Sequence, residues 1–98
     1  MTMIKRFHLG AVKWEVKVSN RDMDLRQAYG VCCYHESKIT LQNTSEGKNR
    51  KPEAIEQTLY HEVVHAILDT MGKEELSGDE EFVQQFSLLL HQFEKTKK

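Results

Sequence analysis

Two histidines and a glutamate form the sequence HEVVH, in which Glu62 follows His61 directly and His65 stands four residues after His61. In a helix, residues i and i+4 lie one turn apart on the same face, so both imidazoles can reach one ion at the 2.0–2.1 Å that zinc requires. Glu62 is rotated by about 100° from His61 and can address a water molecule instead of the metal. Zinc acidifies such a water, and a carboxylate can take its proton. The motif therefore predicts a zinc site with His61 and His65 as ligands and Glu62 as general base.

The segment that must carry this motif is predicted to be a helix from Pro52 to Met71, because proline suits a first turn and Gly72 is a typical stop. Apolar residues cover most of its circumference, namely Ile55, Leu59, Val63, Val64, Ala66, Ile67, Leu68 and Met71. The remaining wedge is polar and consists of Thr58, His61, Glu62, His65 and Asp69. A helix that is apolar nearly all round is buried, and buried polar groups need partners. One metal ion would satisfy both histidines; the alternative is a structural pair with internal hydrogen bonds.

A catalytic zinc site needs a third protein ligand, and three acidic residues stand at the start of a second helix predicted from Ser77 onward. Glu81 points away from the apolar stripe of that helix, whereas Asp79 lies near its centre and Glu80 at its edge. Helix geometry therefore leaves both Asp79 and Glu80 as candidates for the third zinc ligand. Glu80 has a competing role in a capping box with Ser77 as N-cap. His91 lies about 16 Å along the helix from Glu80, too far away to share an ion with it.

The first half of the chain reads as strands. Apolar and polar residues alternate over 12–18, and two β-rich runs, 28–35 and 38–43, are separated by a short polar pair that indicates a hairpin. Residues 44–51 contain no apolar side chain and are predicted to form a solvated loop with a basic cluster. The pattern predicts an α+β fold in which a small antiparallel sheet of about three strands packs on two helices, as one domain over residues 1–98.

The composition excludes several classes of protein. Of 98 residues, 39% are hydrophobic and 30% charged, and the net charge is −1, so the chain has a globular profile and no basic footprint for nucleic acid. No apolar run is long enough to cross a membrane, and no secretory signal is visible. Cys32 and Cys33 are adjacent, so we expect strand packing without a disulfide and a cytoplasmic location. The oligomeric state is open at this stage.

Two segments, TLYHEVVHAILDTMG at 58–72 and DEEFVQQFSLLL at 79–90, resemble the gluzincin side of the zincins. They are similar to small phage and prophage metallopeptidases, distant relatives of the ImmA/IrrE-type group, which pair a TLxHExxHA helix with a DExxVxxxA helix. The family's glutamate, three residues before the aliphatic position at Val83, falls on Glu80. The resemblance thus implies Zn²⁺ bound by His61, His65 and Glu80, with Asp79 in reserve. Ser87 stands where the family often has alanine.

The resemblance also implies a peptide or protein substrate that lies along a sheet-edge strand, which it assigns to residues 38–43. Zincins often stabilise the oxyanion with a Tyr or His, and here five candidates stay open: Tyr29, Tyr34, Tyr60, His35 and His91. The predicted function is a zinc-dependent metallopeptidase. The alternative, suggested by the small size of the chain, is a catalytically weak zincin-fold regulatory module that binds a host or phage protein.

Overall fold

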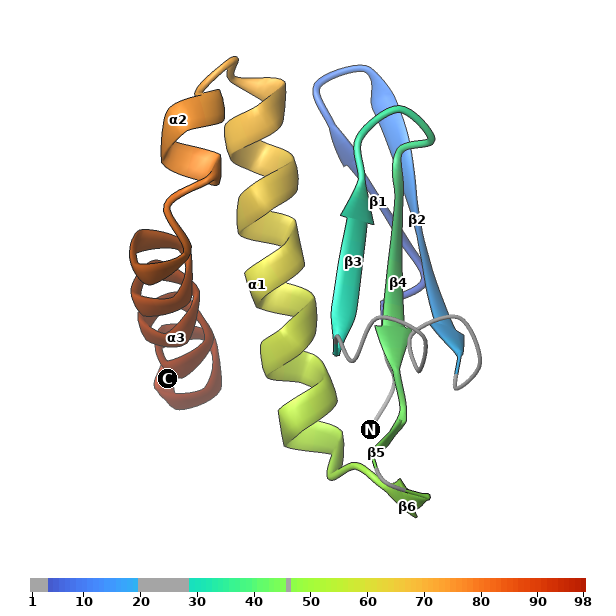
Figure 1. Ribbon diagram of the computed structural model, residues 1–98. Coiled ribbons are helices and arrows are strands. Elements are labelled where there is room, and N and C mark those ends of the chain that lie inside the picture. The colour runs from blue at the N-terminus through green and yellow to red at the C-terminus, as the bar shows by residue number, and fades with distance from the viewer. Residues whose placement is uncertain (1–3, 20–28, 46) are drawn as a thin grey trace.

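The computed structural model describes residues 4–19, 29–45 and 47–98, which form three layers (Figure 1). The strands are β1 (Arg6–Leu9), β2 (Val12–Ser19), β3 (Gly30–Cys33), β4 (Lys38–Gln42), β5 (Thr44–Ser45) and β6 (Lys48–Asn49). The helices are α1 (Pro52–Thr70), α2 (Glu74–Ser77) and α3 (Glu80–Thr96). Helix α1 lies between the sheet and α3, so it is covered on two sides (Figure 1). None of the described helices is long and apolar enough to span a bilayer.

The main sheet has the strand order β1-β2-β4-β3. Strands β3 and β4 form the predicted antiparallel hairpin, and β1 pairs antiparallel with β2. Strand β2 runs parallel to β4, with Val16 opposite Ile39, so the sheet is four-stranded and mixed where we expected about three antiparallel strands. The α+β class is confirmed. Alternation of apolar residues shows which face of a strand is buried, but it contains no information on the strand's partner or direction.

Strand β4 is an internal strand, so the assignment of residues 38–43 to a sheet edge was wrong. It hydrogen-bonds to β2 on one side and to β3 on the other, and its Ile39 and Leu41 are fully buried. In the described part of the chain, the edge strand on the side of α1 and the cleft is β3. An edge strand presents unpaired backbone N–H and C=O groups, and here β3 is the strand that offers them.

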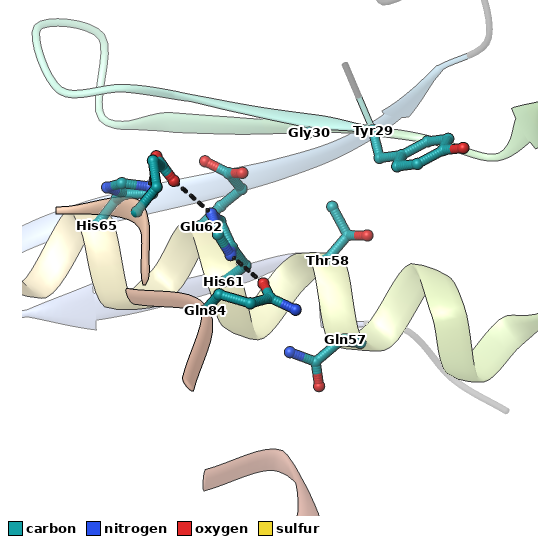
Figure 2. A pocket seen from close by; sticks show the side chains of 9 residues that line it. Tyr29, Gly30, Gln57, Thr58, His61, Glu62, His65 and Gln84 are labelled. Atoms are coloured by element: carbon teal, nitrogen blue, oxygen red, sulfur yellow. Dashed lines mark hydrogen bonds and ion pairs between the residues drawn. The ribbon is translucent and has the colours of Figure 1, made fainter. Parts of the chain in front are cut away.

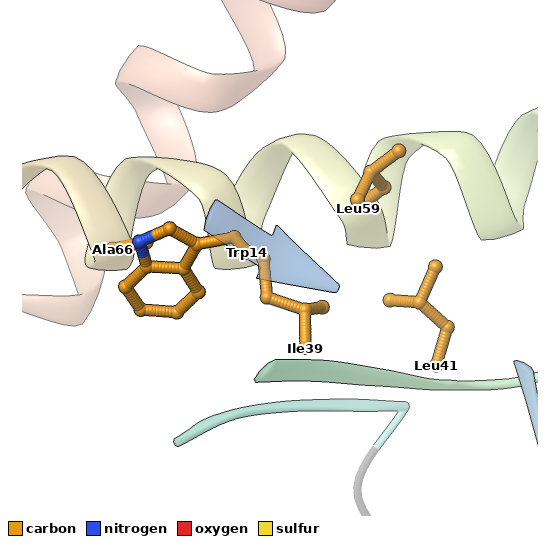
Figure 3. Close-up of a cluster of buried hydrophobic side chains, with 5 residues drawn as sticks. All are labelled: Trp14, Ile39, Leu41, Leu59 and Ala66. Atoms are coloured by element: carbon orange, nitrogen blue, oxygen red, sulfur yellow. The ribbon is translucent and has the colours of Figure 1, made fainter. Parts of the chain in front are cut away.

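The hydrophobic core lies between the sheet and α1 (Figure 3) and consists of Trp14, Ile39, Leu41, Leu59 and Ala66. A second cluster, formed by Val64, Leu68 and Val83, joins α1 to α3. Packing on two sides explains why α1 is apolar around most of its circumference. The predicted limits of this helix are confirmed within one residue, and Gly72 has the positive φ of +75° that favours glycine after a helix.

The second long helix begins later than predicted. Ser77 ends the short helix α2, and α3 starts at Glu80 with Asp79 as its N-cap. The Asp79 carboxylate accepts a hydrogen bond of 3.1 Å from the backbone N–H of Phe82. The capping box with Ser77 as N-cap was therefore wrong, because an aspartate two residues later fills the same role. This frees the Ser77 hydroxyl for a different contact.

Within the segment predicted to be a loop, β5 (Thr44–Ser45) pairs antiparallel with β6 (Lys48–Asn49). Arg50 is half-buried and donates hydrogen bonds of 2.7 Å to the carbonyl of Gln42 and to Oγ1 of Thr58. Its guanidinium also lies 4.2 Å from the centre of the Tyr29 ring. The hairpin is thus anchored to α1 and to the end of the sheet that lies next to the site described below.

Candidate metal centre

The two histidines of the motif lie side by side on α1 and converge on one carboxylate of α3. His61 Nε2 lies 3.2 Å from Glu80 Oε2, and His65 Nε2 lies 2.9 Å from Glu80 Oε1. The centres of the two rings are 5.0 Å apart. The i, i+4 spacing on α1 and the N-terminal turn of α3 together produce this convergence.

The second nitrogen of each ring is held by another side chain. His61 Nδ1 lies 2.8 Å from Gln84 Oε1 (Figure 2). His65 Nδ1 lies 3.1 Å from Ser77 Oγ. An amide oxygen accepts, so Nδ1 of His61 carries the proton, and the Ser77 hydroxyl can accept in the same way. Each Nε2 faces an oxygen of the Glu80 carboxylate. A ring nitrogen and a carboxylate oxygen at this distance need a proton or a metal cation between them, and a single cation would serve both rings.

The donor set fits zinc. One ligand atom each from His61, His65 and Glu80 lie within 4.8 Å of one another, which makes them a group that could hold one metal ion. Two imidazole nitrogens and one carboxylate oxygen are the ligands of many catalytic zinc sites, which leave a fourth position open. The Glu80 side chain is 66% exposed, so the group opens to solvent. Asp79, the reserve candidate, caps α3 and is not part of this group.

Glu62 lies next to the group but is buried, with 8% of its surface exposed. Burial raises the pKa of its carboxyl above the ordinary value, His61 and His65 oppose that rise, and Glu80 adds to it. Desolvation disfavours the charged form of a carboxyl, so Glu62 binds a proton more readily than an exposed glutamate. This is the property of a general base that must also return its proton.

Gly30, at the start of β3, allows the edge strand to approach α1 closely. A Cβ atom at this position would lie 2.7 Å from Cγ2 of Thr58 and 3.1 Å from Cγ of Glu62. Only glycine fits this contact without displacing the Glu62 side chain or the Thr58 methyl group. Our sequence reasoning missed Gly30; the signal was an isolated glycine in a strand pattern, which often marks a close backbone approach. It also missed Gln84 and the histidine contact of Ser77.

The site lies in a cleft of about 440 Å³ between α1, β3 and the start of α3. Tyr29 and Thr58 lie at one end and His65 at the other (Figure 2). All five oxyanion candidates are in the described part of the chain, and among them Tyr29 lines the cleft while the other four do not. Tyr34 packs near Trp14, and Tyr60 stacks on His91.

His91, the weaker ligand candidate, lies elsewhere along α3. Its ring nitrogens lie 2.7 Å from Gln57 Oε1 and 2.7 Å from Glu56 Oε1, at the other end of the contact between α1 and α3. The sequence-based exclusion of His91 from the metal group agrees with this placement.

The two cysteines are free thiols, as expected for a packing role. Burial, followed by the charges of Glu62 and Asp69, raises the pKa of Cys32 to about 12. A thiol with such a pKa stays protonated at neutral pH, which makes it a poor nucleophile and a poor metal ligand. Cys32 packs against the core cluster instead.

The sequence profile of one known protein family matches residues 2–97, almost the whole chain. Neither the curated proteins nor the solved structures gave a match. The family match supports the HExxH metallopeptidase part of the resemblance drawn from the sequence, and it gives no support to a phage origin or to the ImmA/IrrE-type group. The chain belongs to the SprT-like family, which is of the zinc-metallopeptidase-like, HExxH type.

Proposed function

We propose that this protein is a zinc-dependent metallopeptidase that hydrolyses peptide bonds in a peptide or protein substrate, and that it acts in the cytoplasm. The observation that carries the proposal is the convergence of His61, His65 and Glu80 on one point of a cleft, directly beside the buried carboxyl of Glu62. The family membership supports the same chemistry.

The residues of the chain divide the work as follows. His61, His65 and Glu80 would hold zinc, which supplies a Lewis acid that polarises a carbonyl and lowers the pKa of water. The Glu62 carboxylate takes the proton of the attacking water and then passes it to the leaving amine. Its raised pKa suits both transfers, because a carboxyl with a raised pKa is a stronger base than an exposed glutamate and can still release its proton to the leaving amine.

The edge strand β3 is the place where an extended substrate would bind. Gly30 lines the cleft, and a peptide added along the free side of β3 would run past Glu62. Tyr29 lies at the end of the same cleft and is our candidate for a hydrogen bond to the oxyanion. We therefore propose β3 as the substrate-binding edge in place of residues 38–43. We also propose Tyr29 from among the five oxyanion candidates considered from the sequence.

The direct test is to compare Glu62→Gln with wild type after zinc loading, using an unstructured protein such as casein as substrate. We expect cleavage to fall by about 10²–10⁴-fold while the zinc content stays the same. Glu53→Gln, an exposed change in the first turn of the same helix, is the matched control and should keep full activity. Cleavage that survives in Glu62→Gln would exclude the mechanism, and wild type without bound metal would exclude the site.

A second function, a catalytically weak module that regulates a partner protein by contact, is favoured by one feature. The side chain of Glu80 is 66% exposed, and few elements line the cleft. The cleft therefore offers little surface for contact with a substrate side chain. This function predicts that Glu62→Gln retains partner binding and that wild type does not cleave the partner.

A further inference from the structure

Helix α3 forms the outer layer of the molecule, on the side of α1 that faces away from the sheet (Figure 1). Within this fully described helix, Val83 and Ser87 are the buried residues, and both are small. Large apolar side chains lie on another side: Phe86 is 49% exposed, Leu89 66% and Phe93 60%. Phe82 extends the same row, with its ring centre 5.7 Å from that of Phe86, and is itself half-buried against the cluster that joins α1 to α3. We call these four residues the α3 stripe.

The α3 stripe has the spacing of a helix-packing seam. Its members are separated by four, three and four residues, so at 100° per residue they fall within an arc of about 60°. With 150–250 Å² for each aromatic side chain, the exposed part of the stripe amounts to roughly 300 Å² of apolar surface. The largest apolar patch of a monomeric protein is often of this size and often serves in binding, so the α3 stripe is a candidate contact surface.

The charges at the two ends of α3 identify the occupant. Asp79 precedes the helix and Lys97 follows it, and their separation of eighteen residues equals five turns, so they flank the stripe on the same side. Lys97 also pairs with Glu94 of its own helix at 3.1 Å, and its side chain is 54% exposed. An antiparallel second copy would bring Asp79 of each chain to Lys97 of the other. A parallel copy would place like charges together. Gln85 and Gln92, on the other flank, are uncharged and tolerate either arrangement.

We propose that two copies of this protein form a two-fold symmetric dimer in which their α3 helices pack antiparallel through Phe82, Phe86, Leu89 and Phe93. The self-complementary charges meet the requirement of an isologous interface, in which each patch contacts itself. Glu80 and Gln84 face α1 on the opposite side of α3, so both clefts remain open in the dimer.

The test is sedimentation velocity on the full chain at roughly 1 µM to 1 mM, a range that covers weak and moderate dimer affinities. We expect wild type to dimerise and Leu89→Lys to raise the dimer dissociation constant by at least about 100-fold, because symmetry removes two buried leucines at once. Leu88→Lys is the matched control: Leu88 is 46% exposed but is rotated by about 100° from Leu89, so the dimer should persist. Phe93→Lys serves as a second stripe variant, with circular dichroism to check folding.

The orientation is tested by Lys97→Glu. In the antiparallel dimer this change places an acid next to Asp79 of the other chain and should raise the dissociation constant about tenfold at low salt, with less effect in 1 M salt. In a parallel pair it would exchange one like-charge contact for another and leave the constant unchanged, which would overturn the proposed arrangement. If wild type stays monomeric at all concentrations, the partner of the stripe is not a second copy of the chain, and this result would overturn the proposal. Equal effects of Leu88→Lys and Leu89→Lys would do the same.

Discussion

The contact between α1 and α3 holds histidines and carboxylates at both of its ends, and the two ends differ in which groups share the carboxylate: two imidazoles at one end, one imidazole and a lysine at the other. At the end next to the cleft, His61 and His65 direct Nε2 at the same Glu80 carboxylate, with Nδ1 held by a separate partner. At the far end, each nitrogen of His91 has an oxygen acceptor of its own, on Glu56 and on Gln57.

The hydrogen bonds around Gln57 fix the orientation of His91 at the far end. The Ser87 hydroxyl donates to the Gln84 carbonyl at 3.1 Å, so it accepts from Gln57 Nε2 at 3.2 Å. This directs the Gln57 oxygen to His91 Nδ1, which must donate to it. His91 Nε2 shares Glu56 with Lys95, whose Nζ lies 3.4 Å from the same oxygen, so a lysine stands where a second histidine stands beside Glu80. Tyr60 stacks on the His91 ring with centres 4.8 Å apart. A carboxylate shared by two imidazoles, as Glu80 is, is the better candidate for a metal site.

The largest expected difference between the two ends is in zinc binding. We predict that His65→Ala lowers zinc affinity by at least about 1,000-fold, because a three-ligand site loses one of its donors. His91→Ala should leave zinc affinity unchanged, since this ring makes no contact with the metal group. Competition with a chromophoric zinc chelator measures both constants. Equal losses in the two variants would remove the distinction between the ends.

A smaller effect is expected from the side chains that orient the ligands. Ser77→Ala removes the partner of His65 Nδ1 and should lower zinc affinity by about 10–100-fold. Gln57→Ala breaks the hydrogen bond to His91 at the far end and should lower the free energy of unfolding without changing zinc affinity. The same chelator competition distinguishes them; a Ser77→Ala affinity within twofold of wild type would contradict an orienting role.

A substitution at Gly30 tests how closely the edge strand β3 packs against α1 next to the cleft. Gly30→Ala should lower the free energy of unfolding by about 1–3 kcal/mol, because the added methyl would meet Thr58 at 2.7 Å and must displace it or Glu62. Gly78→Ala is the control, since its Cβ would lie at an ordinary 3.5 Å from the nearest atom and its φ is −79°. Urea denaturation measures both. If both alanines are tolerated equally, β3 does not approach α1 as closely as described.

The smallest effect concerns pH at the far end. The hydrogen bond from His91, helped by Lys95 and opposed by burial, lowers the pKa of Glu56 from its ordinary value of 4.5. A carboxyl with a lowered pKa in the folded state stabilises the fold above pH 4.5, and this contribution is lost as the pH falls through the lowered value. At pH 7, the free energy of unfolding measured by urea denaturation should be about 1 kcal/mol larger for wild type than for Glu56→Gln. The difference should shrink as the pH falls below 4.5; a difference that grows on acidification would contradict the pKa direction.

Local patterns in the sequence were sufficient for the parts of the molecule that depend on neighbours in the chain. The spacing of His61 and His65 predicted their shared face, Pro52 and Gly72 predicted the limits of α1, and the apolar circumference predicted its burial. These features follow from helix geometry alone.

The parts that were missed depend on contacts between distant segments. The parallel pairing of β2 with β4 joins strands that are separated by the β3 segment, and no alternation pattern encodes that choice. Helix geometry could not separate Asp79 from Glu80, because it assumed one continuous helix from Ser77 and the chain forms α2 there instead. Glu80 was selected through the resemblance, and the structure places it next to both histidines.

The most direct test of the metal centre is X-ray absorption spectroscopy on zinc-loaded wild-type protein, together with the zinc content per chain. We predict one zinc per chain with two imidazole ligands, further nitrogen or oxygen atoms at about 2.0–2.2 Å, and no sulfur. A sulfur shell at about 2.3 Å would assign the metal to Cys32 or Cys33. That result, or a protein that retains no zinc, would contradict a site formed by His61, His65 and Glu80.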